Sequence, residues 1–505
     1  MFTRESLTGT ITGTPMGWFD EGTRRHRRHK IYVGILVIWA LSVLWARFKP
    51  QPAGLSVLSN PYPVPASSVQ LHLDVTGFTK EGAELRQREI FAAILKMIAE
   101  AKRFIVMDFF LLNEYRGNAA GVERDVTSEL TEALISKRKI QPEVSIVVIT
   151  DPINTVYGGA ESLELTRLKQ AGVTVITTNL TKLRDSNPWY GGPWRMTARW
   201  LGNSAGGKLL PNPFQSGNRV SVRSWLALLN FKANHRKVIM ADRDGSVASL
   251  VTSSNPHSAS SANSNLAVEF VDGPWRELMA SEQAVAAFSG SPFSIDISGI
   301  TTPTTTATST VTVQIATEGR IAQAMEQELA QAGSGDMVNA LIFYVADRRI
   351  ISALTDAALR GASVNVILDP NKDAFGRTKN GLPNRATASE LMLRSSRLYL
   401  RWYDTHGEQA HSKMLLIRKA DGSAVLITGS ANWTKRNLRD LNLETDVIVS
   451  GSQTADPLLR ASELFDRLWM NRDGVYTAEY AKYANDSFWL VLQERVMERL
   501  GFCSW

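Results

Sequence analysis

Two segments of the chain, NHRKVIMADRDGSVASLVTSSN (residues 234–255) and AHSKMLLIRKADGSAVLITGSAN (residues 410–432), follow the same pattern. Each begins with a His and a Lys two residues apart, and these lead into an apolar run of strand type. Because side chains alternate along a strand, the His and the Lys of each segment point to one face. The Asp-Gly pair that follows is a strong hairpin signal, so each segment is predicted to fold back and return its final Asn to its His.

Each predicted hairpin offers an imidazole, an ammonium group and a carboxamide on one patch. The candidate catalytic residues are His235, Lys237, Asn255, His411, Lys413 and Asn432. These groups suit cleavage of a phosphodiester without a metal ion, because one neutral imidazole can attack phosphorus while the other, protonated, donates a proton to the leaving alkoxide. The Lys and Asn side chains would hold the phosphoryl oxygens as charge develops. One His-x-Lys pair would mean little, whereas two copies with the same turn and the same Ser-x-Asn are strong evidence.

At these residues the chain resembles the phospholipase D superfamily, whose signature is two H-x-K-x4-D motifs, each followed by G-S-x-N. His235, Lys237 and Asp242 fit the first motif, and Thr252 takes the place of the Gly. The second copy keeps the His, the Lys and a full G-S-x-N, but Arg418 stands where the motif Asp would fall. Since that Asp is supportive in the family, we expect activity to survive its loss with altered stability or pH dependence.

The resemblance covers residues 69 to 470, approximately, and implies both a fold and a mechanism. The fold is α/β, with two pseudo-symmetric α/β/α sandwich halves and the site between them. The mechanism has two steps and uses neither metal nor cofactor; His235 is the nucleophile that forms a phosphohistidine, and His411 is the acid/base. The residues alone treat the two His almost symmetrically, so this assignment rests on the resemblance. Supporting roles are expected for Asp242, Ser430, Glu269 and Glu444. The two Glu could orient an imidazole, although ordinary surface carboxylates are the alternative.

The order of expected elements also repeats along the chain. Strand-like VQLHLDV (69–75) opens a series of helices and apolar strands that leads to Asp151-Pro152, and VTVQIAT (311–317) opens the same series, which leads to Asp369-Pro370. Strands that alternate with helices predict an α/β sheet covered by helices. The predicted divisions are a basic cytoplasmic segment (1–30), a transmembrane anchor (31–48), a tether (49–68), a first half (69–297), a Thr-rich linker (298–310) and a second half (311–505).

Positive charge is concentrated near the N-terminus. The net charge is +7, of which residues 1–50 carry +5 and the rest of the chain only +2. The body is therefore close to neutral, whereas a protein that neutralises nucleic-acid phosphates usually carries more positive charge. The stretch RRHRRHK (24–30) precedes IYVGILVIWALSVLWA (31–46), which has no charged residue. A bilayer core requires about 20 apolar residues, with a lower limit near 17, so this run can cross with tilt and flanking residues.

An uncleaved anchor competes with two other interpretations of this run, a cleaved signal peptide and a buried core helix. A thirty-residue leader without an A-x-A-like cleavage site argues against the signal peptide. The dense basic flank argues against the core helix, so we favour the anchor. The positive-inside rule then places the N-terminus in the cytoplasm and the catalytic body in the periplasm or outside the cell.

An insert at roughly residues 180–230 is basic and rich in Trp. It contains Lys182, Arg184, Arg195, Arg199, Lys208, Arg219 and Arg223 against the single Asp185, with Trp189, Trp194, Trp200 and Trp225 between them. Three interpretations stay open: an interface with lipid headgroups, a stacking platform for single-stranded nucleic acid, or a folded insertion whose Trp residues form a local core.

The chain has a single cysteine, Cys503, which excludes an intrachain disulfide and any Cys-rich metal centre. The leading hypothesis is a membrane-anchored phospholipid phosphodiesterase or phosphatidyltransferase, whose partners are a phospholipid, the membrane surface and an alcohol acceptor. The alternatives are a membrane-anchored, metal-independent nuclease of the same superfamily and a non-catalytic scaffold. Nucleic acid is the less favoured partner because the body is nearly neutral.

Overall fold

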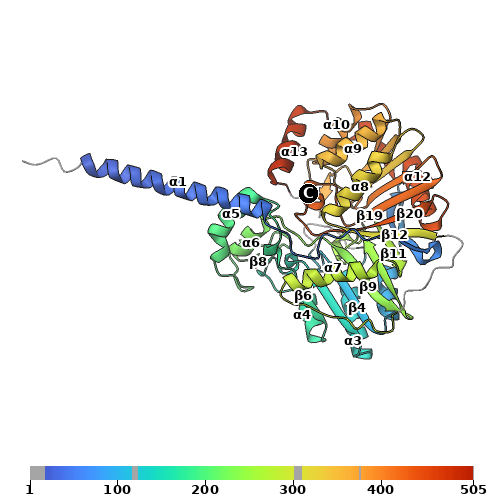
Figure 1. Ribbon diagram of the computed structural model, residues 1–505, viewed down its shortest axis with the longest axis horizontal. Helices are drawn as coiled ribbons and strands as arrows, with labels where there is room; N and C mark the ends of the chain where they lie inside the picture. The colour runs from blue at the N-terminus through green and yellow to red at the C-terminus, as the bar shows by residue number, and fades with distance from the viewer. Residues whose placement is uncertain (1–17, 116–122, 301–309, 375–376, 504) are drawn as a thin grey trace, which may run out of the picture.

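Two large sheets and their helices form the body of the protein, and one long helix projects from it (Figure 1). The computed structural model describes residues 18–115, 123–300, 310–374, 377–503 and 505. The projecting helix is α1 (Trp18–Phe48). Most strands that follow it divide between the two large sheets in chain order; β1 is the exception near the N-terminus. Two short pairs form separate two-stranded sheets: β7 (Leu210–Pro211) with β8 (Arg219–Val220), and β15 (Asp373–Ala374) with β16 (Arg377–Thr378).

The first sheet has eight strands in the order β3-β2-β11-β10-β9-β4-β5-β6. Their bounds are β2 (Val69–Phe78), β3 (Glu84–Arg88), β4 (Phe104–Phe109), β5 (Ser145–Thr150), β6 (Thr174–Thr177), β9 (Lys237–Arg243), β10 (Ser246–Thr252) and β11 (Asn265–Val271). The parallel strands β4, β5 and β6 are joined by helices, whereas β9, β10 and β11 are antiparallel. The accompanying helices are α2 (Ile90–Glu100), α3 (Val126–Ile140), α4 (Leu163–Gln170) and α7 (Trp275–Phe288).

The second sheet has nine strands in the order β1-β12-β20-β19-β18-β13-β14-β17-β21. Their bounds are β1 (Tyr62–Pro65), β12 (Thr310–Thr317), β13 (Met337–Ile342), β14 (Ser363–Leu368), β17 (Leu398–Tyr403), β18 (Lys413–Arg418), β19 (Ser423–Gly429), β20 (Thr445–Ser452) and β21 (Thr477–Glu479). The helices are α8 (Gly319–Gln331), α9 (Arg348–Leu359), α10 (Asn384–Met392), α11 (Lys435–Leu438), α12 (Asp456–Met470) and α13 (Phe488–Leu500). In sheet order, the seven strands β12-β20-β19-β18-β13-β14-β17 correspond to β2-β11-β10-β9-β4-β5-β6 of the first sheet, with the same directions. The repeat seen in the sequence is therefore a repeat of structure.

The two sheets share one central core and have separate outer cores. The central core joins residues of both sheets, such as Val268 and Val447, with Trp275 of α7 and Phe465 of α12. The outer face of the first sheet packs on α2, α3 and α4, and the outer face of the second packs on α8 and α9. Figure 1 shows α3 and α4 on one side of the body and α8 and α9 on the opposite side. Helices therefore cover both faces of each sheet, which gives the expected α/β sandwich architecture.

The segment predicted as a tether packs on the second sheet before the chain enters the first. Leu55 is buried in the central core, Ser59 donates its backbone N–H to Ile315 O at 2.9 Å, and β1 pairs with β12. This packing arises because the apolar residues of the segment bury in the core while its backbone completes the edge of the sheet. Of the expected Thr-rich linker (298–310), residues 301–309 lie outside the described residues. The domain boundaries themselves stay predictions.

Helix α1 includes a candidate membrane span, Arg25–Phe48, whose most apolar 18-residue stretch has a mean hydropathy of 2.0. By length and composition it can cross a bilayer, and only 11% of its most apolar window is buried in the protein. The exposed side chains include Ile35, Leu36 and Leu44. An apolar surface of this extent is unfavourable in water and suits a lipid environment.

Both predicted hairpins are confirmed. In the first, Arg243 pairs with Ser246 across the Asp244-Gly245 turn, and the left-handed φ values of those two residues, 47° and 86°, suit a two-residue turn. In the second hairpin, Arg418 pairs with Ala424, so its loop is longer.

The Gly of the second G-S-x-N segment has a packing reason that its counterpart in the first half does not share. A Cβ on Gly429 would lie 2.4 Å from Thr445 O and 2.6 Å from Asp446 Cα, closer than any real contact. The corresponding residue of the first hairpin, Thr252, lies opposite Ala267 and is accommodated. Thr in place of the motif Gly is therefore a local difference in packing between the two halves.

We expect Gly429→Ala to lower the free energy of unfolding by about 3 kcal/mol, because the added methyl group must displace the backbone of β20. Gly333→Ala is the matched control, since its Cβ would meet only Arg360 O, at 3.8 Å. Denaturant unfolding of both variants measures the difference; equal midpoints would contradict the packing argument.

Candidate active site

The residue that precedes each predicted catalytic His is fixed by an aspartate at the end of a parallel strand. Asp151 Oδ2 accepts the backbone N–H of Asn234 at 2.7 Å, and Asp369 Oδ2 accepts that of Ala410 at 2.8 Å. The two aspartates belong to the repeated Asp-Pro pairs after β5 and β14. The sequence showed these pairs as a sign of duplication, and the structure adds that they position the start of each His-x-Lys strand.

An aromatic ring lies beside each His-x-Lys pair. The ring centroids of Phe110 and His235 are 4.9 Å apart, and those of Phe343 and His411 are also 4.9 Å apart. Lys237 Nζ lies 5.5 Å from the Phe110 centroid and donates to His235 O at 2.7 Å. The Lys of the second pair repeats both contacts, at 5.2 Å from the Phe343 centroid and 2.5 Å from His411 O. Backbone and ring therefore fix both ammonium groups in the same pose.

Each imidazole is oriented by a residue of the other half. His235 Nδ1 lies 2.9 Å from Glu444 Oε1, and His411 Nδ1 lies 3.1 Å from Asn265 Oδ1. A side-chain oxygen that accepts from Nδ1–H leaves the lone pair of Nε2 free. Both imidazoles thus present a basic Nε2, and neither half holds its own His without the other.

The two orienting residues are equivalent in the repeat but differ in charge. In each half the Ser of the Ser-x-Asn segment contacts the orienting residue: Ser430 Oγ donates to Glu444, and Ser253 Oγ donates to Asn265 Oδ1 at 2.9 Å. Glu444 also accepts a hydrogen bond from Asn437 Nδ2. One imidazole therefore faces a buried carboxylate and the other faces a neutral amide.

Burial and mutual repulsion shape the charges of the site. Burial lowers the pKa of His235 and of His411 well below the usual value, and the neighbouring Lys side chains lower both further. Burial also lowers the pKa of Lys237 to about 7 and that of Lys413 well below its usual value. Burial raises the pKa of Glu444 to about 7, against the opposing effect of Lys237. The imidazoles are thus neutral near pH 7, in a pocket where an anion would relieve the repulsion between the basic groups.

The two predicted Asn residues are both buried. Asn255 Oδ1 accepts the backbone N–H of Leu111 at 3.2 Å, so its NH₂ group remains for another partner. Asn432 is 6% exposed, and its Oδ1 has no hydrogen-bond partner among the described residues. Both carboxamides follow the return strands of the hairpins, as the sequence predicted.

Asp242 and its missing counterpart lie at the far ends of the hairpin strands. Asp242 Oδ1 accepts the backbone N–H groups of Lys102, Arg103 and Phe104 at 2.8–3.1 Å and so fixes the start of β4. At the equivalent place in the second half, Arg418 forms an ion pair with Asp466 of α12, with a closest N–O distance of 3.1 Å. The departure from the motif thus exchanges one structural contact for another, away from the imidazoles.

The structure does not bring Glu269 to His235 or His411. Its carboxylate lies 2.9 Å from His72 Nε2 and 2.7 Å from Arg243 Nη1. The contact partner of His411 is Asn265, which the sequence analysis did not single out. The only available signal was a polar residue at the start of the apolar run NLAVEFV, ten residues after Asn255.

One family model and several solved structures match this chain. Residues 325–469 match the family model described as cardiolipin synthase, PLD-like domain. The chain is similar to the solved structure of phosphatidylserine synthase from Haemophilus influenzae Rd KW20, with a TM-score of 0.50 and 10% sequence identity over 87% of this chain and 94% of that one. This likeness shows a shared fold.

Two other solved structures are similar to a lesser degree. Polyphosphate kinase from Porphyromonas gingivalis has a TM-score of 0.42 and 12% identity over 81% of this chain and 51% of that one. The phospholipase D family member Nuc from Salmonella typhimurium has a TM-score of 0.24 and 20% identity over 33% of this chain and 97% of that one. The comparison with curated proteins found no match.

We expect Asn265→Asp to raise the pKa of His411, because a carboxylate on Nδ1–H favours the protonated ring. NMR titration of ¹⁵N-labelled histidines measures the effect. Asn263→Asp is the matched control, since Asn263 Oδ1 accepts the backbone N–H of Gln409 at 2.9 Å. A His411 midpoint that moves equally in both variants would contradict the assigned contact.

Proposed function

We propose that this chain is a member of the phospholipase D superfamily and acts as a membrane-anchored phospholipid phosphodiesterase or phosphatidyltransferase. The observation that carries the proposal is that the Nδ1 atoms of His235 and His411 each contact a residue of the opposite half. Two oriented imidazoles flanked by two buried Lys form a centre suited to an anionic phosphodiester.

The proposed reaction proceeds in two displacements. The Nε2 lone pair of His235 attacks phosphorus, the P–O bond to the leaving alcohol breaks, and His411 gives its Nε2 proton to that oxygen. His411 then takes a proton from water or a second alcohol, whose oxygen attacks phosphorus as the P–N bond breaks. His411 must be protonated for the first step, and the negative charge of the bound phosphodiester favours that protonation against the neighbouring Lys side chains.

The unequal orienting residues support His235 as the nucleophile. Attack through Nε2 places positive charge on the imidazole of the covalent intermediate, and the carboxylate of Glu444 stabilises that charge. The amide of Asn265 offers His411 a neutral acceptor, so His411 releases its proton more readily. The sequence alone could not distinguish the two roles.

Two features support a lipid as the substrate. The matched family model is described as cardiolipin synthase, PLD-like domain, and cardiolipin is a phospholipid. The candidate span of α1 would also hold the body at a membrane surface. With the basic stretch before it in the cytoplasm, the body would lie on the opposite side of the membrane.

The lipid reaction is tested by mass-resolved product analysis. The full chain in vesicles of phosphatidylglycerol, phosphatidylethanolamine and phosphatidylcholine, with EDTA and a primary alcohol, is expected to form phosphatidic acid, a phosphatidyl-alcohol or cardiolipin. The His235→Ala variant should form none of them. Absence of lipid products from the folded wild-type chain, together with cleavage of single-stranded DNA, would replace the lipid proposal by the nuclease.

A change of leaving group tests the two His roles. We expect His411→Ala to lose 10²- to 10⁴-fold in kcat on an alkyl phosphodiester, the usual range for general acid catalysis, but to stay within about tenfold of wild type on a p-nitrophenyl phosphodiester. A low-pKa phenolate leaves without a proton, whereas the nucleophile is needed for both substrates. His235→Ala is therefore expected to be inactive on both, and the reverse pattern would exchange the two roles.

A further inference from the structure

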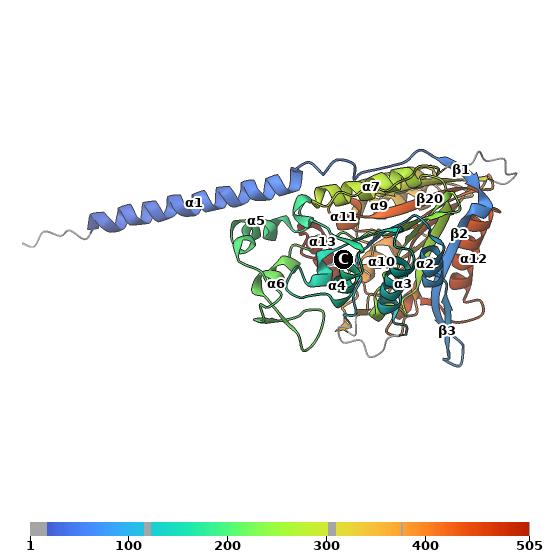
Figure 2. The ribbon, with the colours of Figure 1, turned by 90° about the horizontal axis from the view of Figure 1, so that it is seen from below.

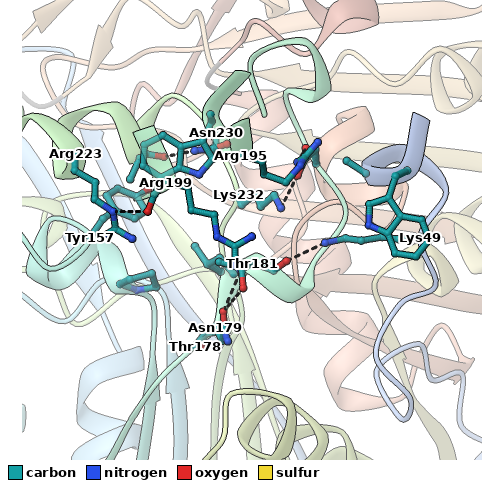
Figure 3. Close-up of a pocket in the computed structure, with 17 residues that line it drawn as sticks. Lys49, Tyr157, Thr178, Asn179, Thr181, Arg195, Arg199, Arg223, Asn230 and Lys232 are labelled. Atoms are coloured by element: carbon teal, nitrogen blue, oxygen red, sulfur yellow. Dashed lines mark hydrogen bonds and ion pairs between the residues drawn. The ribbon is translucent and has the colours of Figure 1, made fainter. Parts of the chain in front are cut away.

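A cavity of about 330 Å³ lies where the end of α1 meets the insert of the first half (Figure 3). Its walls include Trp45 near the end of α1 and Lys49 just after that helix. The loop after β6 and the insert helices α5 (Pro188–Met196) and α6 (Val222–Leu228) also contribute. The histidines, lysines and asparagines of the candidate active site do not line it. Its volume is that of a small-ligand pocket.

Basic side chains dominate the charged part of the cavity wall. Five basic side chains and one acidic side chain line it: Lys49, Arg195, Arg199, Arg223, Lys232 and Asp185. The one carboxylate is already engaged, because Asp185 forms ion pairs with Lys232, at 2.5 Å, and with Arg195. In the described part of the chain, Lys49, Arg199 and Arg223 have no carboxylate within ion-pairing distance. The cavity therefore retains positive charge that an anion would neutralise.

The cavity is held at a defined place on α1. Arg195 Nη2 donates to Ser42 O at 2.7 Å, and Asp185 donates its backbone N–H to Ala46 O at 3.2 Å. The rings of Trp39 and Trp189 have centroids 5.4 Å apart. These contacts bind α5 along the last turns of the candidate span, and Trp39 lies about 14 Å from Phe48 at the helical rise per residue.

The end of the body that carries the cavity also exposes apolar side chains. On the insert, Trp200 is 74% exposed, and on α13 the exposed side chains Phe488, Trp489 and Val496 share one face of the helix. Figures 1 and 2 show α5, α6 and α13 at the end of the body from which α1 projects. If α1 crosses a bilayer, this apolar surface meets the same leaflet, and the cavity opens at the depth of the lipid phosphates.

We propose that this cavity binds the phosphate of an anionic phospholipid headgroup in the leaflet next to the body, at a site separate from the paired histidines. Arg199 and Arg223 supply the charge that is free for the phosphate, and Trp45 and Trp194 flank it at the level of the interface. The inference goes beyond the proposed reaction and rests only on α1 as a membrane anchor. A lipid held here would keep the body, and with it the reaction centre, against the lipid surface.

The test is a calorimetric titration of the full chain in neutral detergent, in a His235→Ala background that prevents turnover. The probes are dihexanoylphosphatidylglycerol, dihexanoylphosphatidylcholine and inorganic phosphate. We expect only dihexanoylphosphatidylglycerol to bind, because the cavity recognises both the negative charge and the lipid. Arg199→Ala combined with Arg223→Ala should weaken that binding by roughly 25-fold, since each basic residue near a lipid surface contributes about fivefold.

Matched variants separate the cavity from general effects. Lys208→Ala removes one charge from an exposed residue of the same insert outside the cavity and should change binding by less than twofold. Arg199→Lys combined with Arg223→Lys keeps the charge and should retain most of the affinity, which guards against misfolding of the Ala variant. Unchanged binding in the double Ala variant, equal binding of phosphatidylcholine, or equally tight binding of inorganic phosphate would each overturn the proposal. Activity of the same variants with His235 intact on a soluble phosphodiester tests the reaction separately, so a failure of either idea is distinguishable.

Discussion

The contact between the two halves is the constraint on which the rest of the structure depends. The backbone of Asn234 pairs with that of Leu443, and the backbone of Ser264 pairs with that of Ala410, so each His-x-Lys strand begins beside a strand of the other half. The side-chain contacts of the two catalytic-site histidines cross between the halves in the same way. A site assembled in this way exists only when both sheets are folded and the shared core is closed, which couples the chemistry of the centre to the stability of the whole body.

Local patterns were sufficient to predict the parts of this arrangement that depend on one strand or one turn. The two-residue period of a strand predicted that each His lies on the same face as its Lys. The Asp-Gly turns predicted that each final Asn returns toward the His of its own segment. Residues that meet through strand register between distant segments were harder to predict. Glu269 lies on β11 and Asn265 begins it, but only the pairing of that strand with its neighbours decides which of them faces the imidazole. The packing of residues 51–68 on the second sheet was missed for the same reason, because an edge strand is defined by its partner.

The site concentrates basic groups in a buried place, which is unfavourable without an anion. Two imidazoles and two Lys side chains lie together, and burial is the main cause that lowers the pKa of each. Neighbouring basic groups lower the pKa values of His235, His411 and Lys413 further, whereas nearby carboxylates oppose the lowered pKa of Lys237. Holding these groups close costs free energy in the folded protein, and a bound phosphodiester offsets that cost because it supplies negative charge. The same electrostatic interaction therefore favours both substrate binding and the protonation of His411 that the first step requires.

The replacement of Glu by Asn at equivalent positions has a consequence for how such a centre can evolve. If the two halves were separate copies of one gene product, a mutation that changed Glu444 to an amide would appear twice and would remove the carboxylate from both histidines. When both halves belong to one chain, the two equivalent positions can mutate independently. One imidazole can then contact a carboxylate while the other contacts an amide. The covalent link between the halves thus allows a division of labour that strict two-fold symmetry forbids.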